Sequence, residues 1–341
     1  MTARQHSRFL IDDRWFGDHG IGRFAREVNK RLALRLLGAT GLPWSPLDPF
    51  RLSLAMLRLP RAACVFIPGY NAPFFPFRPF LFTIHDLNHI DRTENSSFLK
   101  RLYYRLVIRR ACRFAFRVLT VSEYSRQRII DWAGLDAGQV VNVGNGVDAC
   151  FNPQIPLHEF SYRYLLCVSS RKAHKNEARL LEAFSRARIE AGIHLVFTGQ
   201  ADEQMKQLCA RLALTERVHF IGQVSEADLP CWYRGAIALV FPSLYEGFGL
   251  PLIEAMACGT PVLTSNVTAL PEIAGDAALL VDPLSVEEIA TGIERLCHDS
   301  QLREELCCKG LERAKRFSWD AVAGRVEAVL NTMENFAQGA D

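Results

Sequence analysis

The chain has 341 residues, of which 49% are hydrophobic and 23% charged, with a mean hydropathy of +0.02. This length favours two domains of average size, and the composition excludes a disordered tail protein and a membrane channel. No run reaches the ~18 consecutive apolar residues of a spanning helix, and the start, MTARQHSRFLIDDRWF, lacks the apolar core of a secretory signal. We therefore expect a cytoplasmic protein.

The net charge of +3 conceals an asymmetry between the halves. Residues 1–150 contain 22 Lys/Arg and 12 Asp/Glu, a balance of +10, whereas residues 151–341 contain 18 and 25, a balance of −7. Such a division indicates two domains with different partners. A basic half requires an anionic partner, which could be nucleic acid, a membrane surface or an anionic substrate.

Short β-rich segments alternate with helical segments along the chain. In the first half we expect strands at Arg8–Ile11, Cys64–Pro68, Leu81–Ile84, Val118–Val121 and Val140–Val143, and helices at Gly22–Leu37 and Phe98–Phe116. In the second half we expect strands at Tyr164–Val168, His194–Phe197, Val218–Ile221, Ala236–Phe241, Pro261–Thr264 and Ala278–Val281, with helices at Asn176–Glu190, Ala201–Leu212 and Leu250–Ala257. This alternation predicts an α/β fold of two tandem, doubly wound parallel sheets. The run NPQIP, Asn152–Pro156, interrupts the pattern and marks the seam.

The run FPSLYEGFGLPLIEAMACGTPVL, Phe241–Leu263, is the most informative part of the sequence. A strand is followed by a loop with Glu246, Gly247 and Gly249, and then by a short helix with Pro251 in its first turn. The glycines allow backbone amides at the helix start to approach a ligand, and the helix dipole favours an anion such as phosphate.

The two glutamates of this run, Glu246 and Glu254, are separated by seven residues. Carboxylates accept hydrogen bonds from paired hydroxyl groups, so a pair beside a phosphate site indicates a nucleotide-sugar, with one carboxylate for the ribose and one for the transferred sugar. The spacing taken alone favours a surface turn carrying two solvated glutamates. The placement of the glycines and the proline favours the functional interpretation.

With these motifs the sequence resembles the retaining glycosyltransferases of family 4, which have the two-domain GT-B fold. The resemblance covers nearly the whole chain and rests on motifs that occur in the same order: GIGRFAREV, TIHDLNHID, VSEYSRQRI, VGNGVD, VSSRKAHKN, HFIGQVSEADLPCWYRGA, EGFGLPLIEAMACGTPV and FSWDAVA. It implies an acceptor-side domain at 1–153 and a donor-side domain at 154–318, facing each other across a cleft. It also implies a helix and tail at 319–341 that cross back to the first domain.

The resemblance also assigns roles to residues of the second half. Glu254 would hold the ribose hydroxyls of the donor, and Glu246 would lie at the transferred sugar. The donor site would be completed by backbone groups of Phe248, Gly249, Leu250, Gly222 and Val224, the last two in the loop that contacts the base.

Arg171 and Lys175, in SSRKAHKN, resemble the basic pair that this family places on the donor diphosphate. Fixed cations suit this position because the departing nucleotide develops negative charge. The family more often has glycine where this chain has Ser169. Without the glutamate run, Arg171, Lys172 and Lys175 would fit a solvated surface equally well.

Two motifs of the first half have both a structural and a functional interpretation. Gly20 and Gly22 begin a pattern similar to a dinucleotide-binding loop, but no acidic residue follows ~20 positions later to bind a ribose. The resemblance places this loop opposite the donor diphosphate. It places His85 near the reacting carbon of the sugar, and we expect Asp86 and Asn88 on the acceptor side.

We expect no metal and no cofactor. His85 and His89 could form part of a metal site, but the sequence offers no third ligand at a suitable spacing and no Asp-x-Asp to hold a divalent ion on a diphosphate. The resembling family is metal-independent. The ten cysteines include no Cys-x-x-Cys pair, and we interpret them as small buried residues in a reducing compartment.

The expected helix at Phe98–Phe116 carries a strongly basic series that ends just after it: Lys100, Arg101, Arg105, Arg109, Arg110, Arg113 and Arg117. It fits either an amphipathic helix with a solvated basic face or a site of attachment to the anionic inner face of the cytoplasmic membrane. The run NAPFFPFRPF, Asn71–Phe80, is either an apolar loop that assists attachment or a buried segment. No motif supports nucleic-acid binding.

These expectations converge on transfer of a sugar, mannose being favoured, from a nucleotide-sugar such as GDP-mannose to a glycan acceptor. A lipid-linked acceptor in bacterial polysaccharide or lipopolysaccharide assembly would fit. The alternatives are a nucleotide-sugar 2-epimerase on the same fold and a non-catalytic nucleotide-binding module.

Overall fold

The computed structural model describes residues 8–92, 94, 96–157 and 161–338. The chain divides into two units. Unit 1 consists of Met1–Gly146 together with Ser318–Asp341, and unit 2 consists of Val147–Phe317. The C-terminal segment therefore returns to the first unit, as the expected crossing helix requires.

Unit 1 is built on a six-stranded parallel sheet in the order β2-β1-β3-β4-β5-β6. The strands are β1 (Phe9–Ile11), β2 (Arg35–Leu36), β3 (Cys64–Ile67), β4 (Phe80–Thr83), β5 (Arg117–Thr120) and β6 (Val140–Asn142). Strands β1, β3 and β4 are buried throughout, as expected when both faces of a parallel sheet are covered.

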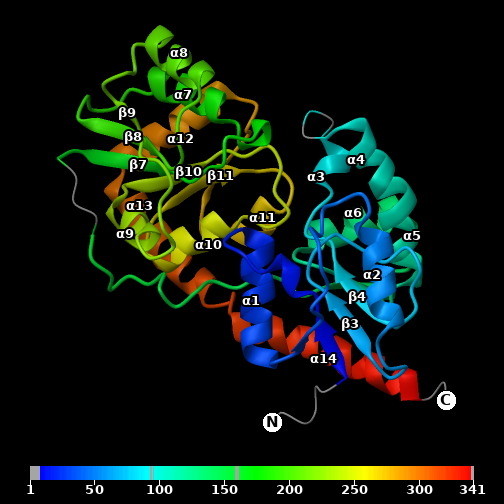
Figure 1. Ribbon diagram of the computed structural model, residues 1–341. Coiled ribbons are helices and arrows are strands. Elements are labelled where there is room, and N and C mark those ends of the chain that lie inside the picture. The colour runs from blue at the N-terminus through cyan, green and yellow to red at the C-terminus, as the bar shows by residue number, and fades with distance from the viewer. Residues whose placement is uncertain (1–7, 93, 95, 158–160, 339–341) are drawn as a thin grey trace. The chain divides into compact units, whose positions relative to one another are not determined.

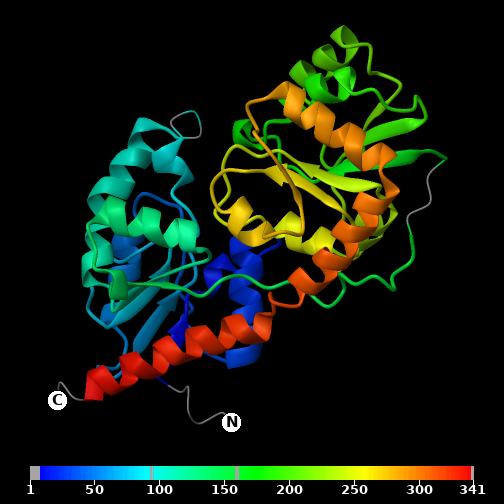
Figure 2. The ribbon, with the colours of Figure 1, turned by 180° about the vertical axis from the view of Figure 1, so that it is seen from behind.

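The two faces of this sheet have separate helical covers. On one face, α2 (Asp48–Leu57), α6 (Glu123–Ala133) and the helix from α4 (Phe98–Tyr103) through the π-helical turn η3 (Tyr104–Ile108) to α5 (Arg109–Phe114) enclose one core. On the other face, α1 (Gly20–Leu32) and α14 (Trp319–Gln338) enclose another. Figures 1 and 2 show α14, in red, beside α1 from both sides.

Unit 2 contains a second six-stranded parallel sheet, in the order β12-β11-β10-β7-β8-β9. Its strands are β7 (Arg163–Cys167), β8 (Ile193–Phe197), β9 (Val218–Phe220), β10 (Ala238–Phe241), β11 (Val262–Ser265) and β12 (Leu279–Val281).

Helices cover both faces of this second sheet (Figure 1). One face is covered by α7 (Glu177–Arg186), α8 (Glu203–Arg211) and α12 (Val286–His298), and α13 (Ser300–Ala314) contributes Leu306 to the same core. The other face is covered by α9 (Leu229–Gly235), α10 (Leu250–Ala257) and α11 (Leu270–Ala274). Both units are thus doubly wound α/β sheets, which confirms the predicted fold class.

Each strand expected from the sequence coincides with an observed one, but one prediction about the first half is wrong. The expected helix Gly22–Leu37 ends at Leu32, and strand β2 occupies Arg35–Leu36. Ala33 adopts a left-handed conformation with φ 50° and bonds back to the carbonyl of Asn29, which stops the helix. Periodicity alone gave no sign of this stop, because an alanine usually continues a helix.

The cysteines agree only in part with the expectation of small buried residues, because Cys150 and Cys308 are exposed. All ten cysteines lie in the described residues, none is in a disulfide, and six of them are buried. No described helix combines the length and the apolar character needed to cross a bilayer.

Candidate active site

The strand order of unit 2 reverses between β10 and β7. From β7 the chain proceeds to β8 and β9 on one side, whereas β10, β11 and β12 lie on the other side. In open parallel sheets, ligands bind beyond the carboxyl ends of the strands at such a reversal. The motif SSRKAHKN leaves β7 there, and the loop with Glu246 leaves β10 there. The topology therefore brings SSRKAHKN and the loop with Glu246 to the same edge of the sheet.

Lys175 and Glu246 form the centre of this site. The Lys175 ammonium donates to Glu246 Oε1 at 2.7 Å, and it lies 4.9 Å from the centre of the Phe241 ring. Both charged side chains are largely buried, with 15% and 13% exposed. Ser243 Oγ donates to the same Oε1 at 2.6 Å. Within the described residues Oε2 of Glu246 accepts no hydrogen bond, so one carboxylate oxygen remains for a ligand.

The loops that carry this pair are tied together by backbone contacts. The carbonyl of His174 accepts from the Leu244 amide at 2.7 Å. Asn176 takes a left-handed conformation, with φ 62°, and its side-chain amide donates to the carbonyls of Pro242 and Pro283. The Glu246 amide donates to Thr268 Oγ1 at 3.2 Å. These bonds fix Lys175 and Glu246 relative to each other before any ligand binds.

Helix α10 begins immediately beyond this pair. Its N-cap is Gly249, with φ 99°, and Pro251 lies in the first turn. The positive φ favours glycine, and a Cβ atom on Gly249 would lie 2.8 Å from Leu270 Cδ2, so a side chain here would also require Leu270 to move. Phe248 is buried and packs edge-on against Phe317. The amides of Phe248, Gly249 and Leu250 thus lie at the start of a helix, where the dipole favours an anion.

Glu254 lies further along α10 and is buried, with 3% exposed. Its Oε2 accepts a hydrogen bond of 2.8 Å from the hydroxyl of Tyr233, which lies on α9 and is fully buried. A buried carboxylate needs such partners to remain charged. The interpretation of Glu254 as a solvated surface residue is therefore wrong.

Arg171 lies on the β8–β9 side of the site. Its guanidinium donates to the carbonyls of Thr198 and of Gln200, pairs with Glu177 at 2.5 Å, and lies over the rings of Phe197 and Phe220. With φ 57°, its backbone is in the left-handed region. The Arg171 guanidinium is thus held by two carbonyl groups, Glu177 and two aromatic rings, whereas the Lys175 ammonium is held by Glu246.

Gly222 and Val224 follow β9 on the same side. The Gly199 amide donates to the Gly222 carbonyl at 2.6 Å, and a Cβ atom on Gly222, whose φ is 75°, would meet Gln200 Nε2 at 2.8 Å. Val224 packs on the core beneath α9 and α10. These residues form the loop at the carboxyl ends of β8 and β9.

In unit 1, Gly20 and Gly22 begin helix α1. The Gly22 amide donates to Nδ1 of His19, the N-cap. A Cβ atom on Gly22 would lie 2.3 Å from the carbonyl oxygen of Gly17. The close approach of the two backbone segments therefore explains this glycine without reference to a ligand.

His85 follows β4 and has a defined tautomer. Its Nε2 lies 2.9 Å from the carbonyl oxygen of Pro68, which can only accept, so Nε2 carries the proton. Burial lowers the pKa of His85 to about 4, and the nearby His19 adds to this shift. The ring is therefore neutral at ordinary pH, and Nδ1 has a lone pair that can accept a hydrogen bond from a hydroxyl group.

Asp86 and Asn88 have a local structural function. Asp86 Oδ1 accepts the Asn88 amide at 2.9 Å and so begins helix α3 (Asn88–Asp91). His89 packs edge-on against Tyr104. In the part of the chain that the structure describes, no three His, Cys, Asp or Glu side chains gather where they could hold a metal ion.

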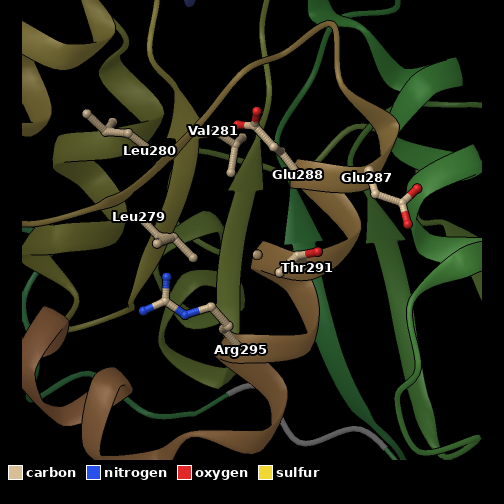
Figure 3. A pocket seen from close by; sticks show the side chains of 8 residues that line it. Leu279, Leu280, Val281, Glu287, Glu288, Thr291 and Arg295 are labelled. Atoms are coloured by element: carbon tan, nitrogen blue, oxygen red, sulfur yellow. The ribbon is translucent and has the colours of Figure 1, made fainter.

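A pocket elsewhere in unit 2 contains none of these residues. It lies between strand β12 and helix α12 at the edge of the sheet (Figure 3), lined by Leu279, Leu280, Val281, Glu287, Glu288, Thr291, Gly292 and Arg295. Its lining includes both acidic and basic side chains. Because no residue of the motifs described above lines this pocket, the candidate site is the one at the strand reversal.

The sequence predicted the charged residues of this site but not the residues that hold them in place. Ser243, Tyr233, His174 and Thr268 hold the glutamates or their loops, and Glu177 pairs with Arg171. Ser243, His174 and Tyr233 lie inside the motifs already noted, but nothing in those motifs indicated that they hold the glutamates. Thr268 comes from another segment, and no local pattern marks it.

Comparison with known proteins defines the class. A model described as "Glycosyltransferase Family 4" matches residues 3–150, and one described as "Glycosyl transferases group 1" matches residues 152–312. Anabaena Alr3699/HepE, solved with UDP and glucose, has a TM-score of 0.77 at 19% identity, covering 96% of this chain and 100% of that one. WaaG, a glycosyltransferase involved in lipopolysaccharide biosynthesis, has a TM-score of 0.71 at 17% identity, covering 93% and 98%. The fold is that of the GT-B glycosyltransferases.

Two curated relatives are mannosyltransferases. O-antigen chain mannosyltransferase B of Escherichia coli is 32% identical over 252 residues, which are 70% of this chain and 66% of that protein. The MMP alpha-(1->4)-mannosyltransferase of Mycolicibacterium hassiacum is 32% identical over 228 residues, which are 65% and 55%. The chain thus spans slightly less than two thirds of the first and about half of the second. It belongs to the family 4 glycosyltransferases and is homologous to bacterial O-antigen mannosyltransferases.

Proposed function

We propose that this glycosyltransferase transfers mannose from GDP-mannose to a glycan acceptor in the assembly of a bacterial surface polysaccharide or lipopolysaccharide, with retention of the anomeric configuration. The observation that carries the proposal is the Lys175–Glu246 pair at the strand reversal, beside the start of α10. The names of the curated relatives support mannose as the transferred sugar.

The contacts of the pair suggest how it would act on such a donor. The Lys175 ammonium has three N–H groups, and one of them is bound to Glu246. The others can donate to the diphosphate, together with the amides of Gly249 and Leu250. As the bond between the sugar carbon and the phosphate oxygen breaks, these groups stabilise the charge that collects on the leaving diphosphate.

The free oxygen of Glu246 can accept hydroxyl groups of the sugar, and Glu254 those of the ribose. The acceptor hydroxyl then attacks from the face on which the diphosphate departs, and its proton passes to the leaving phosphate. One bond to the sugar carbon breaks and one forms on the same face. Inversion of the anomeric centre, observed by NMR of the product, would contradict this route.

The 2-epimerase and the non-catalytic module are distinguished from transfer by one assay. With purified protein and GDP-mannose, a transferase releases nucleoside diphosphate at a substantial rate only when an acceptor is present. An epimerase converts the donor without acceptor, and a binding module does neither. A panel of nucleotide-sugars then identifies the donor through thermal stabilisation, because a ligand that binds the native state raises the unfolding temperature.

We propose that turnover needs no metal ion, because Lys175 and the start of α10 supply the positive field at the diphosphate. Activity should be unchanged after treatment with EDTA and desalting. Loss of turnover that Mn²⁺ or Mg²⁺ restores would contradict this part of the proposal.

We further propose that the reaction takes place at the inner face of the cytoplasmic membrane, on an acceptor carried by a lipid. The balance of +10 in residues 1–150 supports this location, because basic segments near anionic lipids gain ~1 kcal/mol per Lys or Arg. Attachment would be reversible and sensitive to salt.

A further inference from the structure

Helix α2 is apolar on both sides. Leu52 and Met56 point into the core of unit 1 and are fully buried, whereas Phe50, Leu54 and Leu57 are exposed by 51%, 48% and 48%. An ordinary surface helix has a polar outer side. The outer side of α2 lies on the same side of the sheet as α5 (Figure 1). Its exposed apolar side chains are therefore suited to contact with a binding partner.

The loop 74–78 runs along this helix and is fixed to it. The Phe74 amide donates to the Pro49 carbonyl at 3.0 Å, and the Phe75 amide donates to Ser53 Oγ at 2.9 Å. At the other end, Arg78 donates to the carbonyl of Pro60 at 2.8 Å. The side chains of Phe75 and Phe77, exposed by 47% and 43%, are thus presented on a fixed loop.

Arg110 connects this loop to α5. Its guanidinium donates to the carbonyl of Phe74 and lies over two rings, 4.9 Å from the centre of Phe74 and 4.8 Å from that of Phe114. Phe74 in turn stacks on Phe50 with 5.0 Å between ring centres. The contacts thus join α2, the loop and α5 into one surface, the aromatic face, whose exposed apolar members are Phe50, Leu54, Leu57, Phe75, Phe77 and Phe114.

The charges around the aromatic face have one sign. In residues 47–61, 73–78 and 98–117 the only acid is Asp48, which is buried and paired with Arg14. Of the basic residues there, Arg101, Arg105 and Arg113 are exposed and make no ion pair with any described residue. Such a surface complements an anionic one. Two copies of it would repel each other, because neither copy offers an exposed acid.

We propose that the aromatic face docks on an anionic lipid bilayer, with its phenylalanine and leucine side chains in the headgroup region and its arginines on lipid phosphates. Aromatic and basic side chains together are the composition of interfacial anchors. The proposal rests on the membrane part of the proposed function and deepens it, because it adds an apolar contribution that salt does not screen.

The test is partition of the full chain onto vesicles, measured by co-sedimentation. Vesicles of phosphatidylcholine with phosphatidylglycerol are compared with pure phosphatidylcholine, from low salt to about 1 M, where the Debye length falls to ~3 Å. We expect the wild type to prefer the anionic vesicles and to keep part of its binding at high salt. The double variant F75S/F77S should bind at least tenfold more weakly and lose the part that resists salt.

Two further variants separate the contributions. R101Q/R105Q should weaken binding only at low salt. L157S/L284S is the matched control, because Leu157 and Leu284 are exposed by 54% and 64% in unit 2, and it should bind as the wild type does. Circular dichroism shows that each variant is folded.

Three outcomes would overturn the proposal: equal binding by F75S/F77S and wild type, equal binding to both kinds of vesicle, or no binding. A wild-type dimer that F75S/F77S converts to a monomer in sedimentation equilibrium would assign the face to a second copy and overturn it as well. Release of nucleoside diphosphate with a soluble acceptor and no vesicles tests the proposed reaction separately, and F75S/F77S should keep normal turnover in that assay.

Discussion

The Lys175 ammonium lies 2.7 Å from Glu246 Oε1, although the two residues are 71 positions apart in the sequence. Strands β7 and β10 are hydrogen-bonded neighbours, and each charged residue lies in the segment that follows one of them. The parallel arrangement therefore brings the two carboxyl ends, and with them the two charges, to one edge of the sheet. The pair is formed before a donor binds, which is the condition for electrostatic stabilisation without reorganisation.

Lys175→Ala should lower turnover at saturating donor by a factor of about 10² to 10³, because the leaving diphosphate loses a fixed cation. Lys172→Ala is the matched control, since Lys172 is an exposed lysine of the same motif, and it should keep normal turnover. Initial rates of nucleoside diphosphate release measure both variants. Equal rates for the two variants would show that Lys175 does not stabilise the leaving diphosphate.

The chemical part of the site was predictable from the sequence because it depends on residue types within short motifs. Glu246, Gly249 and Glu254 lie within nine residues of each other, and a strand-to-helix turn places them on one rim. The supports depend on long-range contacts. The hydroxyl of Tyr233 reaches Glu254 only because α9 and α10 pack on the same face of the sheet, and no spacing expresses that contact.

Tyr233→Phe should weaken donor binding about tenfold with little change in turnover at saturating donor. The variant removes the hydroxyl that holds Glu254 Oε2, and a buried hydrogen bond to a charged group contributes about 1.5–3 kcal/mol, of which part is recovered by rearrangement. Isothermal titration with the donor measures the affinity. In a Glu254→Gln background the same change should have almost no effect, whereas an equal loss in both backgrounds would assign Tyr233 to packing alone.

The fold was predictable wherever strands are continuous apolar runs, and it was not where one residue departs from its usual conformation. Ala33 ends α1 with φ 50°, and Arg35–Leu36 form β2 instead of another turn of helix. Helix α2 gave no clear amphipathic signal because its outer side is apolar as well as its inner side. The apolar outer side that removes the amphipathic periodicity of α2 is also the feature from which we infer a docking surface.

Gly249→Ala should destabilise unit 2 by about 1–3 kcal/mol and weaken donor binding. Alanine at φ 99° is strained, and its Cβ would lie 2.8 Å from Leu270 Cδ2, so the Leu270 side chain or the start of α10 must shift. Gly192→Ala is the control, since that glycine has open space around its missing Cβ and no positive φ. Urea unfolding measures the stability. A Gly249→Ala protein as stable as Gly192→Ala would show that the helix start tolerates a side chain.

His85 makes the stability of unit 1 depend on pH in a direction that follows from its pKa. Burial lowers the pKa of His85 to about 4 in the folded protein, whereas the ordinary value is about 6.5 in an unfolded chain. The unfolded chain therefore binds the extra proton between these values. The contribution of the neutral ring is complete above pH 6.5 and is lost as the pH falls toward 4, by at most ~1.4 kcal/mol per pH unit.

His85→Gln should remove this dependence, because an amide can donate to the Pro68 carbonyl without titrating. The free energy of unfolding is measured by urea titration at pH 7.5, 6.0 and 5.0 for both proteins. His194 and His219 also have lowered pKa values and contribute to the pH dependence of both proteins, so the difference between the two isolates His85. The wild type should lose more stability than His85→Gln between pH 7.5 and 5.0. Parallel curves would mean that the ring titrates in the folded state as it does in the unfolded chain, and would remove the argument that His85 is neutral, with Nδ1 able to accept a hydrogen bond from a hydroxyl group, at the pH of catalysis.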